Sequence, residues 1–207
     1  MKFHVNKPEF NKYLLQTLFA VGVVAITIIA DLVSKTAVVN ACLESGMSES
    51  GTYFRLATVI EGFFYITYTQ NTGGAWSLGG DNPAFMTVVI ILTFVALAVF
   101  MLLLFFPDKR KNLFFIISLS LITGGATGNL VDRLAFGYVR DFLSFYPFGY
   151  SFPIFNVADV ALVIGVILMV ICIILLAFKS EKKDKSEIQA IQDNTEITQE
   201  EKADDEK

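Results

Sequence analysis

Four long apolar runs constrain this chain more than any other feature of its sequence. Residues 14–30, 84–106, 113–131 and 160–178 contain no charged side chain. A helix needs about 20 mainly apolar residues to cross a bilayer. Hydrophobic residues make up 54% of the 207 residues, a composition that favours a membrane protein. We therefore predict an all-α integral membrane protein with four transmembrane helices.

The rest of the composition excludes several classes of protein. Only 17% of the residues are charged, which argues against a disordered chain, a nucleic-acid-binding protein and an ordinary soluble enzyme. His4 is the single histidine, and Cys42 and Cys172 are the two cysteines. These numbers exclude a disulfide scaffold and a cysteine-based zinc site. We expect neither a metal ion nor a cofactor.

The net charge of −4 comes from the end of the chain. Residues 180–207 contain five lysines and ten acidic side chains, with no aromatic residue and few aliphatic ones. Such a segment cannot bury a core of its own. We predict a membrane domain over residues 1–179 and a charged, disordered cytoplasmic tail over residues 180–207.

The placement of basic residues predicts the orientation, because cytoplasmic segments carry an excess of lysine and arginine. Basic side chains precede the first run, separate the second from the third, and follow the fourth: Lys2, Lys7, Lys12, Lys109, Arg110, Lys111, Lys179, Lys182, Lys183 and Lys185. Both termini should therefore be cytoplasmic. The loops over about 36–82 and 133–154 should face outward.

The first outer loop contains strand-like segments. Residues 62–69 are rich in aromatic and β-branched side chains, and residues 52–60 show a weaker version of the same pattern. We expect a small extracytoplasmic β-sheet on the membrane surface. Residues 71–74 are predicted to form a turn, followed by a re-entrant segment around residues 75–78.

Polar side chains gather at the predicted outer ends of the helices, where ionisable residues are costly and are candidates for function. Asn129, Asp132 and Arg133 are spaced to share one face of the third helix. Asn156 precedes Asp159 by three positions at the start of the fourth helix. An asparagine thus precedes an aspartate by three positions twice, at the facing ends of consecutive helices. This repetition favours a functional site.

A structural interpretation of the same residues stays open. Asp31 with Lys35, and Asp132 with Arg133, are spaced for local ion pairs that would anchor helix ends. In that case the chain would be a membrane scaffold whose polar clusters lock its helices together. A small transporter with intramembrane carboxylates is a further alternative, although such sites usually lie at the midplane between repeats, and the chain contains no internal repeat.

Elimination narrows the chemistry of an enzymatic site. A serine or cysteine nucleophile with a histidine base is excluded, since His4 lies on the predicted cytoplasmic side. Ser34 and Lys35 are adjacent on a helix and should point apart. Neither a zinc-protease motif nor a phosphate-binding loop is present. What remains is a pair of carboxylates that share one proton and act on a water molecule, as in peptide hydrolysis. The signature of presenilin-like aspartyl proteases is absent.

Four blocks of sequence resemble one known family, the lipoprotein signal peptidases (signal peptidase II), which are bacterial membrane aspartyl endopeptidases. The blocks are DLVSK at residues 31–35, NTGGAWS at 71–77, GGATGNLVDR at 124–133 continuing into GYVRDF at 137–142, and FNVAD at 155–159. The resemblance covers roughly residues 14–178. It implies four transmembrane helices, an outer β-cradle and two cytoplasmic termini.

The resemblance also implies the roles of individual residues. Asp141 and Asp159 would be the catalytic pair, and the supporting residues would be Asn129, Arg133, Asn156, Asn71, Asp31, Lys35 and Asp132, the last as a structural acid. The implied substrate is a prolipoprotein whose cysteine already carries diacylglycerol, cut just before that cysteine. We expect a monomer in the bacterial cytoplasmic (inner) membrane, in contact with lipids, with its active site at the extracytoplasmic face.

Some positions depart from the family pattern. Leu32 stands where glutamine is common, and Gly74 and Trp76 stand where alanine and phenylalanine are common. Residues 42–52 look like an insertion in the first outer loop. None of these differences touches the implied catalytic pair.

Overall fold

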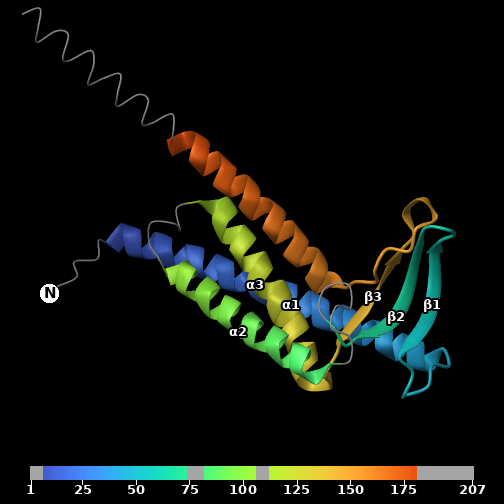
Figure 1. Ribbon diagram of the computed structural model, residues 1–207. Coiled ribbons are helices and arrows are strands. Elements are labelled where there is room, and N and C mark those ends of the chain that lie inside the picture. The colour runs from blue at the N-terminus through green and yellow to red at the C-terminus, as the bar shows by residue number, and fades with distance from the viewer. Residues whose placement is uncertain (1–6, 74–81, 106–111, 181–207) are drawn as a thin grey trace, which may run out of the picture. The chain divides into compact units, whose positions relative to one another are not determined.

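The computed structural model describes residues 7–73, 82–105 and 112–180 (Figure 1). The chain divides into two compact units, Met1–Leu168 and Met169–Lys207. The first three helices, the β-sheet and the beginning of a fourth helix belong to the first unit. The predicted re-entrant segment at 75–78 and nearly all of the charged tail lie outside the described residues.

Four helices are long and apolar enough to cross a membrane, as the apolar runs predict. They are α1 (Lys7–Glu44), α2 (Pro83–Phe105), α3 (Leu113–Phe136) and a fourth helix over Val157–Ser180 that carries no label in Figure 1. Large apolar side chains on their surfaces are exposed, for example Ile26 (69%), Leu92 (61%) and Val163 (58%). Apolar side chains at this density on a helix surface suit contact with lipid rather than water.

Helix α1 is longer than predicted, because the outer loop was expected to begin near residue 36 and α1 ends at Glu44. A charge at Lys35 suggested the edge of the membrane, but the Lys35 side chain is fully buried. Its ammonium lies 2.7 Å from the Asp31 carboxylate, one helical turn away. A charge that is neutralised inside the protein does not mark where a helix leaves the bilayer.

The end of α1 is set by a glycine cap. Gly46 adopts a left-handed φ of 98°, its N–H donates to the Leu43 carbonyl, and the Met47 N–H donates to the Cys42 carbonyl. This is the Schellman pattern, which usually includes an apolar contact across the cap. Met47 and Cys42 supply that contact in a buried cluster with Tyr68. The stretch interpreted as an inserted loop is thus partly helix.

A three-stranded antiparallel sheet contacts α1 and α3, with its strands in the order β1 (Tyr53–Ile60), β2 (Phe64–Asn71) and β3 (Val139–Phe145) (Figure 1). The first two strands confirm the predicted segments with small shifts. The third strand was not predicted, because Arg140 and Asp141 interrupt its apolar pattern. Both charged side chains are nevertheless buried, since β3 lies against the helices as well as against β2.

Helix α3 contacts both α1 and α2, and its glycines allow close approach of its neighbours. A Cβ added at Gly128 would lie 2.6 Å from the Asp31 carboxylate of α1, and one added at Gly125 would collide with the backbone carbonyl of Ala158 at the start of the fourth helix. Small residues at such interfaces let membrane helices pack closely. The glycine-rich end of the third apolar run therefore brings the polar groups of three helices together.

Candidate active site

Asp141 lies on β3 rather than in an irregular loop, and its side chain is only 2% exposed. The β2–β3 register pairs Thr69 with Asp141, which brings the end of β2 beside it. The Asn71 amide there donates to Asp141 Oδ2 at 3.0 Å, and the Asn156 amide donates to Asp141 Oδ1 at 2.6 Å. Burial, followed by the negative charge of Asp159, raises the pKa of Asp141 to about 7.

Asp159 is held by a reciprocal cap at the start of the fourth helix. The Asn156 backbone N–H donates to Asp159 Oδ2 at 3.1 Å, and the Asp159 backbone N–H donates to Asn156 Oδ1 at 2.9 Å. This is a capping box, with Asn and Asp in place of the usual Ser/Thr and Glu/Gln. The Asn156–Asp159 spacing that suggested a functional pair therefore also caps the N-terminus of this helix. The other oxygen, Asp159 Oδ1, accepts the Asn129 amide at 2.7 Å.

Asn156 connects the two carboxyl groups. Its Oδ1 and backbone N–H bind Asp159, and its Nδ2 donates to both Asp141 Oδ1 and Asn129 Oδ1, the latter at 3.0 Å. Asp141, Asp159, Asn129, Asn156 and Asn71 thus form one continuous hydrogen-bonded group. The structure brings together the residues that the sequence placed on two helices and in two loops.

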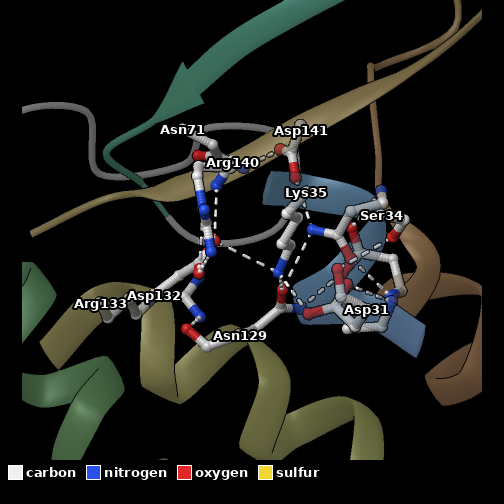
Figure 2. Close-up of polar contacts among 12 residues, drawn as sticks. Asp31, Ser34, Lys35, Asn71, Asn129, Asp132, Arg133, Arg140 and Asp141 are labelled. Atoms are coloured by element: carbon white, nitrogen blue, oxygen red, sulfur yellow. Dashed lines mark hydrogen bonds and ion pairs between the residues drawn. The ribbon is translucent and has the colours of Figure 1, made fainter. Parts of the chain in front are cut away.

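A cluster of buried charges lies beside this group (Figure 2). Lys35 Nζ contacts Asp31 Oδ2 at 2.7 Å, Asp132 Oδ2 at 3.3 Å and Asn129 Oδ1 at 3.1 Å. Asp31 Oδ1 accepts the backbone N–H of Ala158 at 2.9 Å, at the positive end of the fourth helix. The predicted pairing of Asp31 with Lys35 is confirmed, and it joins α1, α3 and the fourth helix.

The predicted pairing of Asp132 with Arg133 is wrong. Asp132 instead pairs with Arg140 of β3, whose Nη2 lies 2.7 Å from Asp132 Oδ1 and whose backbone N–H donates to Oδ2 at 2.9 Å. Consecutive helical residues point about 100° apart, so Asp132 turns toward β3 and α1. Sequence reasoning missed Arg140; the signal was an arginine in an otherwise apolar segment, next to Asp141. Such a residue needs a buried acidic partner.

Arg133 points elsewhere. Its guanidinium donates to the Gly73 carbonyl at 3.3 Å and to the Asn129 carbonyl at 3.5 Å. It lines the same pocket as the two catalytic candidates. The three residues predicted to share a face of α3 therefore divide between the pocket and the buried charge cluster.

The pocket has a volume of about 650 Å³ and two chemically different parts. Its polar end contains Asn71, Asn129, Arg133, Asp141 and Asp159. Its remaining wall is mainly apolar and comes largely from the strand-to-helix connection and the fourth helix, including Phe152, Pro153, Ile154, Val160, Leu162, Val163 and Ile164. Such a pocket suits a ligand that is both polar and strongly apolar.

The geometry favours carboxylate chemistry over a serine–lysine pair. The Ser34 hydroxyl donates to the Asp31 backbone carbonyl of its own helix at 2.9 Å. Lys35 contacts three other acceptors, so its N–H groups are already used. Within residues 7–73, 82–105 and 112–180, no group of three or more His, Cys, Asp or Glu side chains is arranged to hold a metal ion.

Comparison with known proteins gives consistent matches. The family model for signal peptidase II matches residues 23–175. Lipoprotein signal peptidases of Staphylococcus aureus strains JH9 and Newman are each 41% identical to this chain over 107 residues. That segment covers 52% of this chain and 63% of each relative, which is slightly less than two thirds of their length.

Two solved structures of bacterial membrane enzymes have a similar fold. The first, at 2.3 Å resolution, has a TM-score of 0.62 and 34% identity, covering 75% of this chain and 87% of its own. The second, at 1.9 Å resolution, has a TM-score of 0.59 and 35% identity, covering 75% of this chain and 92% of its own.

Proposed function

Because the chain belongs to the signal peptidase II family, we propose that it removes the signal peptide from prolipoproteins whose cysteine carries diacylglycerol. It cuts the bond just before the lipidated cysteine, with a water molecule activated by Asp141 and Asp159. One observation carries this proposal: two carboxyl groups joined by the Asn156 side chain lie at the polar end of a pocket whose other wall is apolar. The polar end suits a peptide bond, and the apolar wall suits acyl chains.

The shared proton belongs on Asp141, whose pKa is raised to about 7 by burial and by the charge of Asp159. Asp159 then acts as the base. It takes a proton from water while the water oxygen attacks the scissile carbonyl carbon, and Asp141 gives its proton to the carbonyl oxygen. When the tetrahedral intermediate collapses, the C–N bond breaks and the proton taken up by Asp159 passes to the leaving amine. One hydroxyl of the intermediate returns its proton to Asp141 as the carbonyl re-forms, which restores the starting protonation of both aspartates. The aspartates thus act as general base and general acid without a covalent intermediate.

The other predicted residues support this chemistry in three ways. Asn71, Asn129 and Asn156 orient the carboxyl groups through their amides. Arg133 supplies a positive charge at the polar end of the pocket, where the oxyanion develops. The remaining residues, Asp31, Lys35 and Asp132, hold α1, α3 and the fourth helix together around the site.

We propose further that the β-sheet and the site face the extracytoplasmic side of the inner membrane, with both termini in the cytoplasm. The support is the distribution of basic residues, which favours this orientation. A site at that height meets both water and the end of a signal-peptide helix, while the substrate's acyl chains stay among membrane lipids. The enzyme acts as a monomer, and the charged tail after residue 180 remains in the cytoplasm.

The test is cleavage of a diacylglyceryl-modified prolipoprotein by the purified protein in detergent. Wild type should cut the substrate, while Asp141→Asn and Asp159→Asn should fold and be inactive. Ser34→Ala is the matched control, because among the described residues the Ser34 hydroxyl bonds only to the backbone of its own helix. Failure of folded wild type to cut a substrate that a known family member cuts would refute the proposal. Normal cleavage by either asparagine variant would refute the dyad, and loss of folded protein in both would favour the scaffold interpretation.

A further inference from the structure

Lys35 has an unusual set of contacts for a fully buried lysine. Two of its three acceptors are the carboxylates of Asp31 and Asp132, which balance its charge. The third is a neutral amide oxygen, Asn129 Oδ1, at 3.1 Å. Charge balance does not require this third contact, because the carboxylates of Asp31 and Asp132 already balance the two cations of the cluster, Lys35 and Arg140.

The contact with Asn129 decides which way its amide points. An ammonium can only donate hydrogen bonds, so the oxygen of Asn129 must face Lys35. The NH₂ group of Asn129 then faces Asp159 and donates to Oδ1 at 2.7 Å. The reversed amide would place an oxygen against the Asp159 carboxylate and an NH₂ group against the ammonium, and both contacts would be repulsive.

The orientation of the Asn129 amide also determines the orientation of the Asn156 amide. Asn129 Oδ1 also accepts a hydrogen bond from Asn156 Nδ2 at 3.0 Å. The second N–H of that NH₂ group donates to Asp141 Oδ1, and the Asn156 oxygen faces the Asp159 backbone N–H. A chain of fixed amide orientations therefore runs from Lys35 through two asparagines to both carboxyl groups.

We propose that Lys35 is a positioning residue for the aspartate pair: its ammonium fixes the orientation of the Asn129 amide, and through it that of Asn156, so that each asparagine presents an N–H to one carboxyl group. The inference rests on the proposed function for its catalytic meaning. Lys35 does not touch the reacting atoms. It acts by holding the carboxyl groups where they meet water and the scissile bond, and small errors in such placement are costly.

The experiment compares Asp31→Asn with the double variant Asp31→Asn/Lys35→Met, which differ only in the lysine. Lys35→Met alone would leave the buried Asp31 carboxylate without its cationic partner and is prone to misfold. Asp31→Asn keeps the oxygen that accepts the Ala158 N–H. We expect kcat of the double variant to be at least about tenfold below that of Asp31→Asn, with KM little changed, because the lost orientation acts on the transition state.

Arg140→Gln provides the matched control. Arg140 belongs to the same buried cluster and pairs with Asp132, but its hydrogen bonds to Asp132 and Thr36 involve neither asparagine. The variant should lower the melting temperature while keeping most of kcat. If kcat falls as much in Arg140→Gln as in the double variant, general destabilisation explains the effect and the inference is wrong.

A second readout does not depend on activity. Hydrogen exchange of the side-chain NH₂ groups of Asn129 and Asn156, followed by NMR on asparagine-labelled protein, reports their orientation and order directly. Exchange should be slow in Asp31→Asn and clearly faster in the double variant. Equal protection in the two would overturn the inference, even if wild type proved inactive on prolipoprotein. An inactive wild type with lysine-dependent protection would refute the proposed function alone.

Discussion

Substitution of Asn156 separates its role in folding from its role at the site. Asn156 is fully buried and makes two kinds of contact. Its oxygen caps the fourth helix by accepting the Asp159 N–H, and its NH₂ group donates to Asn129 and Asp141. Serine keeps an oxygen for the cap and has no amide, whereas alanine has neither group.

The expected losses of stability and of kcat follow from these contacts. Loss of the cap in Asn156→Ala costs about 1 kcal/mol, and the unpartnered Asp159 N–H and the small cavity add roughly 1–2 kcal/mol. Asn156→Ser should lose only about 1 kcal/mol of stability, because the cap remains. In both variants Asp141 loses its 2.6 Å hydrogen bond. Because Asp141 carries the shared proton, this is a hydrogen bond to a neutral group, worth about 0.5–1.5 kcal/mol, which corresponds to a roughly 2- to 13-fold loss of kcat.

Two measurements on the same samples test this reasoning. Thermal or denaturant unfolding in detergent should place Asn156→Ser between wild type and Asn156→Ala. Cleavage assays should instead group the two variants, both below wild type. Full activity in Asn156→Ser would show that the amide does not orient Asp141. Equal stability of the two variants would show that the cap contributes nothing.

Three further predictions concern packing and pH. Gly128→Ala on α3 should destabilise the protein by about 1–3 kcal/mol and lower activity, because its Cβ would lie 2.6 Å from the Asp31 carboxylate. Gly22→Ala on α1 is the control, because its added Cβ would meet nothing within 4 Å; it should be neutral or stabilising by roughly 0.5–1 kcal/mol. Unfolding measurements compare the two variants, and a similar loss of stability in both would contradict the packing argument. The cleavage rate should fall as pH rises through the Asp141 pKa of about 7, since the general acid loses its proton; a rate independent of pH between 6 and 9 would count against Asp141 as the acid. Because this folded-state pKa lies above the ordinary value of 3.8, the folded protein holds the proton longer than the unfolded chain, and stability is lost as pH rises between these values. At pH 8, Asp141→Asn should therefore unfold at a higher temperature than wild type. Its free energy of unfolding should be larger by at most about 4 kcal/mol, and the two proteins should differ little at pH 4.

The site shows how far spacing along a chain can predict a constellation. The Asn156–Asp159 spacing correctly indicated that the two residues lie together, because a three-residue spacing at a helix start has a defined geometry. The Asp31–Lys35 pair was predictable for the same reason. Arg140 was missed as the partner of Asp132, since that pair joins α3 to a strand that the sequence pattern did not reveal. The end of α1 was also misjudged, because the burial of Lys35 depends on residues almost a hundred positions away.

By itself the sequence determined the four membrane helices, two of the three strands and the set of polar residues at the helix ends. These features depend on apolar length, local periodicity and short spacings, which act within one segment. Only the tertiary structure decided that β3 carries Asp141 beside Asn71, that Asn156 joins the two carboxyl groups, and that Lys35 faces Asn129. These contacts cross between segments. They arise because glycines on α3 let three helices approach closely, and because a buried charge is stable only where a partner from another segment can reach it.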